Sequence, residues 1–338
     1  MYEKIEDARI LSGNSHPRLA LNISRLTGIP IINCVCNHFA NKEINVSIKD
    51  NIRNKDIILI QTGCSIENMS INDLFMETLI LIDACKRSST KSITLIMPHY
   101  PYSRQDKKNE SRAPISAKLV ANMLTTAGID RLIVMDLHAS QIQGFFDIPV
   151  DNLYFVNLLT DHLNKTIIQD KPDDYIVISP DEGAIKRNII LSQQLKLPLG
   201  IMHKQRNYSK LNTVEKSVLI CDGELVKGKT AIICDDMCDT GGSLISAVNS
   251  VIEHGAKDVI CIITHGIFSD PALERINKCP HIKKIIVSSS IDQQQNIQKT
   301  IVDKCVKIEE YNISPIISEI IKKIYNGGSV SALFDEMC

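Results

Sequence analysis

The residues best suited to binding or catalysis lie in one segment, in which an apolar run is followed by acidic residues and a small-residue loop. Ala231–Cys234 is followed by Asp235, Asp236 and Asp239 and then by Thr240–Ser243. Backbone N–H groups and hydroxyls at a helix start bind phosphate, and an acidic pair can hold sugar hydroxyls and a hard cation. The alternative is a strand-to-helix turn with a solvated acidic cluster, but such a cluster needs no Thr-Gly-Gly-Ser loop. The pattern therefore predicts a site for a phosphorylated sugar.

The elements that must position these residues follow a regular alternation. Short runs rich in β-branched residues recur, and the helix-like segments Asp73–Ser88 and Ser116–Ala127 follow two of them. This rhythm is typical of parallel βαβ units, so we expect an α/β fold with mainly parallel central sheets. The expected strands are Asp56–Gln61, Ser92–Met97, Arg131–Met135, Tyr175–Ser179, Thr230–Cys234 and Val259–Thr264.

The ends of these strands carry polar side chains. In parallel sheets, ligands bind at the carboxyl ends of the strands, so we expect the function to lie in the loops. The loops concerned are Pro98–Tyr100, Asp136–His138, Ser179–Asp181 and Asp235–Asp236. At 338 residues the chain is long for one core, and an apolar run turns through Pro149–Leu153 into a new helical stretch. Two domains are therefore expected, residues 1–153 and 154–338.

The composition disfavours several classes of protein. Lys and Arg total 38 against 39 Asp and Glu, so nucleic acid is not an expected partner. The segment Met1–Asp7 is acidic and no apolar run is long enough to span a bilayer, so we expect a cytoplasmic protein without a membrane partner. The 11 cysteines include the close pairs Cys34/Cys36 and Cys234/Cys238, neither with Cys-x-x-Cys spacing. Reduced thiols are expected rather than a zinc site or a disulfide framework.

One motif is a decoy. Gly223–Thr230 matches the Walker A pattern of P-loop nucleotide-binding proteins letter for letter. A P-loop follows a strand and runs into a helix, whereas this Gly-Lys-Thr runs into Thr230–Cys234, an expected strand. We therefore interpret the segment as a turn before a strand, with Lys229 as a solvated charge.

Several segments resemble one enzyme family. Asp235–Ser243 resembles the phosphoribosyl-pyrophosphate (PRPP) binding motif shared by phosphoribosyltransferases and ribose-phosphate pyrophosphokinases. Met97–Lys108 looks like the nucleotide-binding loop of the pyrophosphokinases, which simple phosphoribosyltransferases lack. The resemblance to the phosphate-activated class of these pyrophosphokinases spans nearly the whole chain. Its further matches are Ser111–Leu124, Asp136–Leu153, Ser179–Asp181, Lys186–Arg187, His203–Arg206, Thr264–Ser269 and Asn326–Phe334.

This resemblance implies two phosphoribosyltransferase-like doubly wound domains. Residues 1–153 would carry the ATP-side loop and residues 154–338 the ribose 5-phosphate motif, with the last helix packing back on the N-terminal domain. The implied reaction transfers the pyrophosphoryl group of MgATP to the anomeric hydroxyl of ribose 5-phosphate and releases AMP. The implied cofactor is Mg²⁺, and the implied substrates are ATP and ribose 5-phosphate.

That reaction requires positively charged groups in the active site to stabilise developing negative charge. A sugar oxygen attacks the β-phosphorus, so negative charge builds on phosphoryl oxygens and on the departing AMP. The candidate catalytic residues are Arg104, Lys204 and Arg206. By resemblance, Lys204 and Arg206 lie on a mobile loop, and the polar run Gln205–Lys210 suits closure over the substrate.

Further residues complete the expected site. Asp136 and His138 are two apart at a strand end, so we expect both side chains to face one side and to orient Mg²⁺ and the triphosphate. Asp181 is a second metal or ribose ligand by resemblance. The implied ATP-binding set is Phe39, Asn41, Glu43, Arg104, Gln105 and His138, of which the first three would hold adenine across a subunit boundary. The implied Mg²⁺ set is Asp136, His138, Asp181 and Asp235. The implied ribose 5-phosphate set is Asp181, Asp235, Asp236, Asp239, Thr240, Gly241, Gly242 and Ser243.

Allosteric control by inorganic phosphate and ADP is implied by the same resemblance. The candidate residues combine Arg with small hydroxyl groups, which suits a phosphate-shaped effector. They are Arg53, Ser111, Arg112, Ser329, Val330 and Ser331. Because these residues are far apart in sequence, one site built from all of them would draw on neighbouring subunits. We therefore expect a homo-oligomer, by resemblance a hexamer built from dimers. The alternative is a surface charge at Arg53 and a helix-end turn at the terminal loop.

The chain departs from the family pattern at three places, of which Glu182 bears most on turnover. Ser65–Asn72 is longer by a few residues, Asn109–Glu110 differs at a loop tip, and Glu182 stands where a small residue is usual. A carboxylate beside the ribose site either repels the phosphosugar or points to solvent at a helix start. Two other functions stay open. A phosphoribosyltransferase would not need Arg104–Gln105, and a catalytically silent regulatory subunit would have no reason to retain the charged set.

Overall fold

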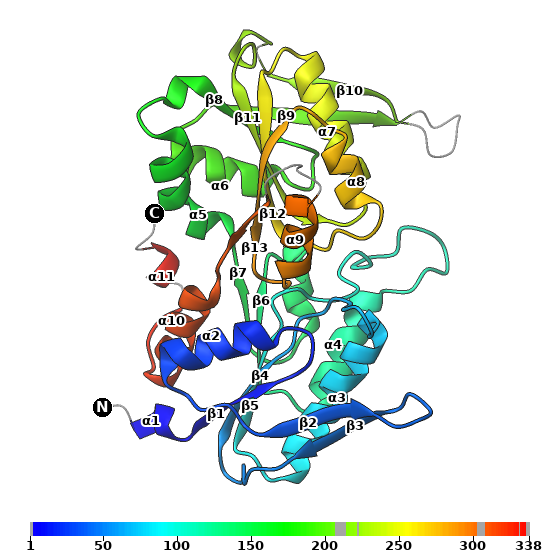
Figure 1. Ribbon diagram of the computed structural model, residues 1–338, viewed down its shortest axis with the longest axis vertical. Coiled ribbons are helices and arrows are strands. Elements are labelled where there is room, and N and C mark those ends of the chain that lie inside the picture. The colour runs from blue at the N-terminus through cyan, green and yellow to red at the C-terminus, as the bar shows by residue number, and fades with distance from the viewer. Residues whose placement is uncertain (1–2, 207–213, 222, 303–307, 331, 336–338) are drawn as a thin grey trace. The chain divides into compact units, whose positions relative to one another are not determined.

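The computed structural model describes residues 3–206, 214–221, 223–302, 308–330 and 332–335, and the chain divides into two compact units (Figure 1). The first unit comprises the chain up to Leu153, together with Ser289–Asp292 and the segment from Asn312. The second comprises Tyr154–Ser288 and Gln293–Tyr311. Each unit is built around its own sheet.

The first unit contains a five-stranded parallel sheet in the order β1-β4-β5-β6-β7. Its central strands are rich in Ile and buried, as expected for a parallel sheet covered on both faces. A separate hairpin pairs β2 with β3 in antiparallel register. The strands are β1 Ala8–Ser12, β2 Cys34–His38, β3 Ile44–Ile48, β4 Asp56–Ile60, β5 Ser92–Ile96, β6 Arg131–Met135 and β7 Val150–Leu153.

Helix α3 (Ile71–Arg87) begins at a capping box. At the start of α3, Ser70 Oγ accepts from Asp73 N at 3.2 Å and Ser70 N donates to Asp73 Oδ2 at 2.8 Å. α3 packs beside α4, and α10 packs beside α2 (Figure 1). The helices are α1 Glu3–Glu6, α2 Pro17–Thr27, α3 Ile71–Arg87, α4 Ser116–Ala127, the 3-10 helix η1 Ser140–Phe145, α10 Ser314–Tyr325 and α11 Ala332–Asp335.

The second unit contains a seven-stranded sheet in the order β10-β9-β8-β11-β12-β13-β14. Neighbouring strands are parallel except β9 and β10, which are antiparallel. The strands are β8 Tyr175–Ser179, β9 Leu199–Arg206, β10 Val214–Ile220, β11 Thr230–Cys238, β12 Asp258–Gly266, β13 Ile282–Ser288 and β14 Ile308–Tyr311. The helices are α5 Val156–Leu163, η2 Asn164–Ile168, η3 Pro172–Asp174, α6 Ile185–Leu195, η4 Gly223–Leu225, α7 Gly242–Glu253, α8 Ala272–Asn277 and α9 Gln294–Val302.

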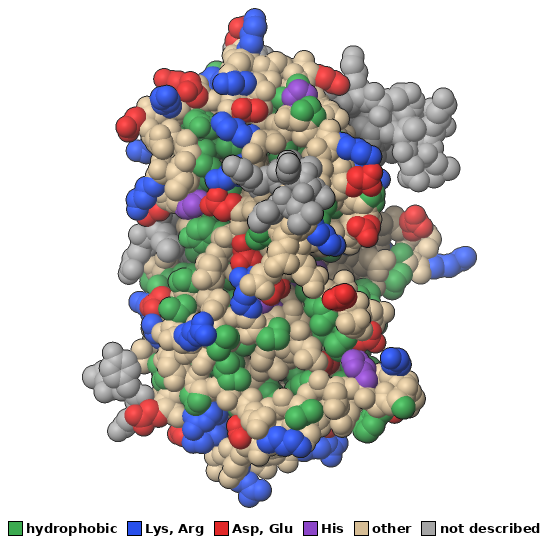
Figure 2. Space-filling view, in the orientation of Figure 1, with side chains coloured by type: hydrophobic (Ala, Val, Ile, Leu, Met, Phe, Trp, Pro, Cys, Tyr) green, Lys and Arg blue, Asp and Glu red, His purple; other side chains and the backbone are tan. Residues whose placement is uncertain are grey.

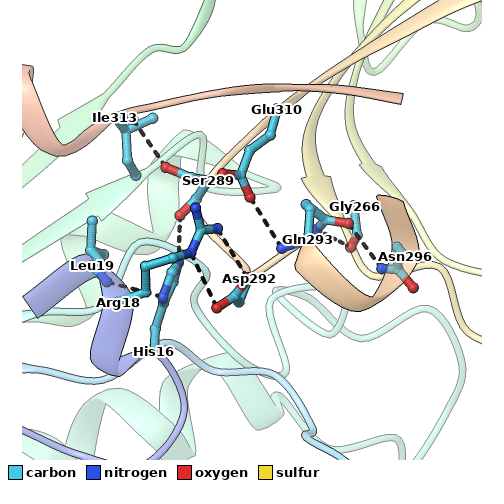
Figure 3. Close-up of polar contacts among 10 residues, drawn as sticks. All are labelled: His16, Arg18, Leu19, Gly266, Ser289, Asp292, Gln293, Asn296, Glu310 and Ile313. Carbon is cyan, nitrogen blue, oxygen red and sulfur yellow. Dashed lines mark hydrogen bonds and ion pairs between the residues drawn. The ribbon is translucent and has the colours of Figure 1, made fainter. Parts of the chain in front are cut away.

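The short segment Ser289–Asp292 is held in the first unit by polar contacts (Figure 3). His16 Nε2 lies 2.9 Å from Ser289 O and donates to it. Arg18 Nη2 pairs with Asp292 Oδ1 at 2.9 Å. Because these partners sit at the start of α2, the contacts fix this late segment of the chain to an early helix.

A second group of contacts in Figure 3 lies within the second unit and ties the start of α9 to two strands. Gln293 N donates to Glu310 Oε2 at 3.1 Å, and Gln293 Nε2 donates to Gly266 O at 2.7 Å. Asn296 Nδ2 in turn donates to Gln293 Oε1 at 2.9 Å. The buried Gln293 amide therefore links α9 with the ends of β12 and β14.

The surface shows no single sign of charge on the face drawn in Figure 2, where basic and acidic side chains are interspersed. This distribution agrees with the near-balance of charges in the sequence. In the part of the chain that the structure describes, no helix is long and apolar enough to cross a membrane.

The predicted α/β fold with mainly parallel sheets is confirmed. Five of the six predicted strands are present within two residues of their expected bounds, whereas the strand predicted as Thr230–Cys234 extends four residues further, to Cys238. α4 begins and ends where the sequence predicted. The Walker A match is a decoy, as interpreted, because Lys229 N closes a turn onto Val226 O at 3.1 Å and Thr230 begins β11. The β2–β3 hairpin was not predicted, because Cys34–His38 has no clear apolar alternation.

Candidate active site

The loop predicted to bind phosphate lies where β11 gives way to α7. Gly241 has a φ of 74°, a left-handed conformation that is strained for residues with a Cβ, so glycine is required at this turn. Arg275 Nη1 donates to Thr240 O at 2.9 Å and holds the loop. Gly242 and Ser243 are exposed in the first turn of the helix. The start of α7 therefore offers backbone N–H groups to an anion.

Asp235 and Asp236 form a close pair with a guanidinium nearby. The Asp235 side chain is 25% exposed, Asp236 is buried, and Asp236 N donates to Asp235 Oδ1 at 2.9 Å. Arg187 Nη1 lies 3.9 Å from Asp235 Oδ1. Desolvation and then the charge of Asp236 raise the pKa of Asp235 well above its usual value, whereas Arg187 opposes the shift. Such a crowded acidic pair favours a bound cation.

Asp181 belongs to the same acidic neighbourhood, because its charge also raises the pKa of Asp235. Ser179 Oγ donates to Asp181 O at 2.9 Å, and Asp181 Oδ1 accepts from Ala184 N at 3.1 Å. The Asp181 side chain therefore fixes the turn that leads from β8 into α6. Glu182, the departure from the family pattern, is exposed in this turn.

Asn188 on α6 is a site residue that the sequence reasoning missed. Its fully buried amide grips both backbone groups of Cys234: Nδ2 donates to Cys234 O at 2.9 Å, and Oδ1 accepts from Cys234 N at 3.3 Å. Nδ2 also donates to Ala184 O at 2.9 Å. The β8 ladder stops opposite Ile233, so the amide continues the pairing of β11 just before Asp235. The only signal in the sequence is an Asn beside the apolar run Ile189–Leu191.

Arg187 was likewise noted only as part of a family match, and the structure gives it a defined place. Its side chain is 12% exposed and lies beside Asp235. The two residues are far apart in sequence, so no local spacing could have paired them. Arg187 is therefore a candidate to bind an anionic substrate or to balance the acidic pair.

Asp136 and His138 lie differently from the expectation that both face one side of a strand end. β6 ends at Met135, and Asp136 has a φ of 40°, so the strand alternation stops before it. Asp136 is buried and its N donates to Leu153 O at 2.7 Å, whereas His138 is exposed. The strand alternation on which the expectation rested therefore ends at Met135, one residue before Asp136. The roles of both residues stay predictions.

Arg104 and Gln105 lie in an exposed turn before α4. Gln105 N donates to Tyr102 O at 3.2 Å, and Gln105 O accepts from Ala117 N at 3.2 Å. Ser116 Oγ donates to Gln105 Oε1. The turn is thus fixed by its own backbone and by α4, while Arg104 is left exposed on it.

Phe39, Asn41 and Glu43 form the tip of the β2–β3 hairpin. Phe39 N donates to Glu43 O at 2.8 Å, and Glu43 N donates to Asn41 Oδ1 at 3.1 Å. Phe39 is 55% exposed, so its ring is accessible to a ligand. The tip therefore offers an aromatic face on which a base can stack.

Lys204 and Arg206 are described only in their backbone, and their side chains lie outside the described residues. Lys204 pairs with Ser217, and Arg206 pairs with Val214, across the β9–β10 ladder. The following segment, residues 207–213, is also outside the described part of the chain. The predicted roles of both residues stay predictions.

The residues predicted to bind effectors are exposed wherever they are described, apart from the half-buried Val330. Arg53 lies in the turn before β4, and its N donates to Asn51 Oδ1 at 3.1 Å. Arg112 has a φ of 67° in the turn before α4, next to Ser111. Ser329 Oγ accepts from Ala332 N at 3.3 Å, while Ser331 lies outside the described residues.

The donor set of the second unit fits a magnesium ion that shares its ligands with a substrate. Among the described residues, no three His, Cys, Asp or Glu side chains are grouped to hold a metal by themselves. Mg²⁺ is commonly bound by one or two carboxylates together with substrate phosphates and water. The oxygen donors of Asp235 and Asp236 meet that pattern, whereas a structural zinc site would need more ligands.

Both units of the chain are similar to known proteins. Residues 8–128 match a family model described as the N-terminal domain of ribose phosphate pyrophosphokinase. Residues 155–302 match the phosphoribosyl transferase domain. The chain is 45% identical over 330 residues to ribose-phosphate pyrophosphokinase 4 of Saccharomyces cerevisiae, covering 98% of this chain and 95% of the relative.

Two further relatives cover the chain to a similar extent. Ribose-phosphate pyrophosphokinase 2 of Schizosaccharomyces pombe is 43% identical over 328 residues, covering 96% of this chain and 97% of its own. The crystal structure of a phosphoribosylpyrophosphate synthetase from Mycobacterium smegmatis superposes with a TM-score of 0.84 at 37% identity. That alignment covers 95% of this chain and 99% of the other. The similarity therefore extends over both units.

Proposed function

The chain belongs to the ribose-phosphate pyrophosphokinase family, whose members are enzymes, and we propose that it transfers the pyrophosphoryl group of MgATP to the anomeric hydroxyl of ribose 5-phosphate. The products are PRPP and AMP, and the reaction serves nucleotide biosynthesis. The observation that carries this proposal is the presence in one chain of the acidic pair and phosphate loop after β11 and of a nucleotide-side domain that matches pyrophosphokinases. A family model specific to pyrophosphokinases over residues 8–128 distinguishes the chain from simple phosphoribosyltransferases.

The sugar substrate is assigned to the second unit. The 5-phosphate binds the loop at the start of α7, where exposed N–H groups and the Thr240 and Ser243 hydroxyls are available. Asp235 and Asp236 accept hydrogen bonds from the ribose hydroxyls. Arg187 beside Asp235 limits the repulsion between this acidic pair and the phosphorylated substrate.

The nucleotide substrate is assigned to the first unit. The exposed Phe39 ring stacks on adenine, and Glu43 accepts from its exocyclic amine. Arg104, Gln105 and His138 contact the triphosphate from turns that the fold fixes independently. In the oligomer that we propose, the Phe39 hairpin serves the nucleotide of a neighbouring subunit.

Magnesium is proposed to bind the acidic residues at the strand ends, with Asp235 as the main protein ligand. When bound, Mg²⁺ neutralises charge on the β- and γ-phosphoryl oxygens. The Lys204 and Arg206 side chains stabilise the negative charge that develops on the same oxygens in the transition state. Their donors are therefore expected to matter more for turnover than for substrate binding.

Control, assembly and location follow the family resemblance. We propose activation by inorganic phosphate and inhibition by ADP through Arg53, Ser111, Arg112 and the terminal loop from Ser329, in a cytoplasmic homo-oligomer. Exposed Arg side chains next to small hydroxyl residues suit the forked contacts that a phosphate group accepts.

The proposal is tested by a coupled assay for AMP release from ATP in the presence of ribose 5-phosphate and Mg²⁺. We expect AMP only when both substrates and the metal are present. A phosphoribosyltransferase would release no AMP but would consume PRPP with a nucleobase. A silent regulatory subunit would bind nucleotide without either reaction, and either of these results would overturn the proposal.

A further inference from the structure

Two thiols outside the candidate active site lie in contact on the β2–β3 hairpin. Cys34 and Cys36 are two apart on β2, so both side chains project from the same face of the strand. Their Sγ atoms are 3.8 Å apart. Both side chains are half-buried and pack against the apolar core of the first unit. The pair is thus neither fully shielded nor freely exposed.

The environment makes the two thiols unequal. Either thiol can donate in the Sγ–Sγ contact. Donation by Cys36 lowers the pKa of Cys34, and Lys49 adds to this shift while burial and Glu77 oppose it. The same hydrogen bond, together with burial, raises the pKa of Cys36. Since the thiolate is the nucleophile, Cys34 is the attacking thiol and Cys36 is the thiol that follows.

Other thiols of the first unit lack this activation. Burial raises the pKa of Cys64 to about 12 and that of Cys85 to about 12. Both residues are buried in the core. They should therefore react slowly with thiol reagents, and they provide internal controls for the Cys34/Cys36 pair.

Closure of a disulfide between these residues requires a local rearrangement of β2 and leaves the bond strained. Two residues of an extended strand span about 6.6 Å, near the upper end of the Cα separations of about 4.4–6.8 Å found across disulfides. The Cβ atoms of two same-face strand residues are about as far apart as their Cα atoms, whereas a disulfide needs Cβ atoms about 3.5–4.5 Å apart. β2 would therefore have to leave its extended conformation between Cys34 and Cys36 for the bond to form. β2 pairs only with β3, and two-stranded ribbons tolerate more twist than larger sheets. A strained bond of this kind is readily reduced again.

We propose that Cys34 and Cys36 form a reversible dithiol–disulfide pair, closed by exchange with a low-molecular-weight disulfide. The Cys34 thiolate attacks one sulfur of the external disulfide and expels the other half as a thiolate. Cys36 then loses its proton and attacks the Cys34 sulfur, expelling the second half. Two protein thiols are oxidised, and one external disulfide is reduced to two thiols. Transient bonds of this type are the ones that reducing compartments permit.

Closure has a consequence at the tip of the hairpin, and this step rests on the proposed function. Phe39 directly follows β2, and Glu43 directly precedes β3. Phe39 N donates to Glu43 O at 2.8 Å. Rearrangement of β2 shifts its register against β3 and moves this tip. Oxidation should therefore weaken the binding of adenine nucleotide at Phe39.

The first test maps thiols in the full chain and needs no substrate. Reduced protein is incubated with glutathione disulfide, quenched in acid, alkylated and analysed by peptide mass. The wild type should show the peptide with Cys34 and Cys36 lighter by two hydrogen atoms and without alkylation. Cys36→Ser should stop at a glutathione adduct on Cys34, and Cys34→Ser should react far more slowly. Cys85→Ser, the matched control, should behave like the wild type.

Two fully alkylated thiols in the wild-type peptide under these conditions would overturn the proposal, as would equal reactivity of Cys34→Ser and wild type. Circular dichroism of each variant shows that it is folded, so a null result is interpretable. ATP binding by calorimetry then compares reduced with oxidised protein. Equal affinity in the two states would overturn the coupling to the hairpin tip. Absence of ATP binding to the reduced protein would instead count against the proposed function.

Discussion

At the scale of single residues, the candidate site holds groups in states that folding alone would not favour. Asp136 adopts a φ of 40°, and desolvation raises the pKa of Asp235. Backbone strain and perturbed pKa values of this kind gather at functional sites, because ligands compensate for them. These residues should therefore reduce the stability of the ligand-free protein while contributing to binding.

Asp235→Asn should stabilise the ligand-free protein at neutral pH and weaken ribose 5-phosphate binding about tenfold or more. The folded state binds the Asp235 proton more tightly than the unfolded state, because burial and Asp236 raise its pKa. The carboxylate therefore costs stability as the pH rises from the usual Asp range through the folded pKa. Thermal unfolding at acidic and neutral pH should show a gain for the variant only at the higher pH.

Asp173→Asn, at an exposed position, is the control for that change and should alter neither property. Calorimetry should find that Asp235→Asn affects ribose 5-phosphate more than ATP. The reverse order would contradict the assignment of the sugar to the second unit. A variant that is less stable than the wild type at neutral pH would contradict the assigned direction of the pKa shift.

Asn188→Leu should destabilise the protein by about 1–3 kcal/mol, because it leaves the buried backbone groups of Cys234 without the amide. It should also raise the KM for ribose 5-phosphate, since the hydrogen bonds from Asn188 hold Cys234, the residue before Asp235. Denaturant unfolding and initial rates measure the two effects. Gln193→Leu on the exposed side of the same helix should change neither. An unchanged KM in the folded Asn188 variant would limit Asn188 to a structural role.

At the scale of elements, the sequence predicted strands and helices where the pattern is local and strong. β4 and β5 are short apolar runs bounded by polar residues, and α4 has an apolar face and ends before its C-cap residue Gly128. The β2–β3 hairpin escaped notice because Cys34–His38 mixes thiols with polar residues. The Asn188 amide and the turn at Asp136 depend on partners distant in sequence, which no local pattern reveals.

The β9–β10 pair carries the expected transition-state cations. Lys204→Ala and Arg206→Ala should each lower kcat by roughly 10²–10³ with smaller changes in KM, because their donors act as charge develops on the phosphoryl oxygens. Steady-state kinetics with both substrates varied provide the measurement. Lys196→Ala, at the exposed end of α6, serves as the control. A variant with altered KM alone would reassign that residue to ground-state binding.

At the scale of the whole molecule, the family assignment rests on similarity over both units rather than on any one motif. The sugar-side motif by itself is shared with phosphoribosyltransferases, and the Walker A match shows how a single pattern misleads. The nucleotide-side segments resolve this ambiguity, because a simple transferase would not need them.

We expect a homo-oligomer whose activity rises with inorganic phosphate and falls with ADP even at saturating ATP. Light scattering measures the mass, and rate titrations measure the two effectors. Arg53→Ala should reduce the phosphate response while leaving AMP formation at high phosphate largely intact, whereas Arg25→Ala on the surface of α2 should leave it unchanged. A monomer, or ADP inhibition fully relieved by ATP with no phosphate response, would contradict this allosteric control.

The most direct test of the central claim is to identify the products by phosphorus NMR. The purified chain is mixed with ATP, ribose 5-phosphate and Mg²⁺, and the spectra are followed with time. Transfer of an intact pyrophosphoryl group predicts AMP and PRPP in equal amounts, with neither product formed when ribose 5-phosphate or Mg²⁺ is omitted. Formation of ADP in place of AMP, or no reaction with all components present, would contradict the account.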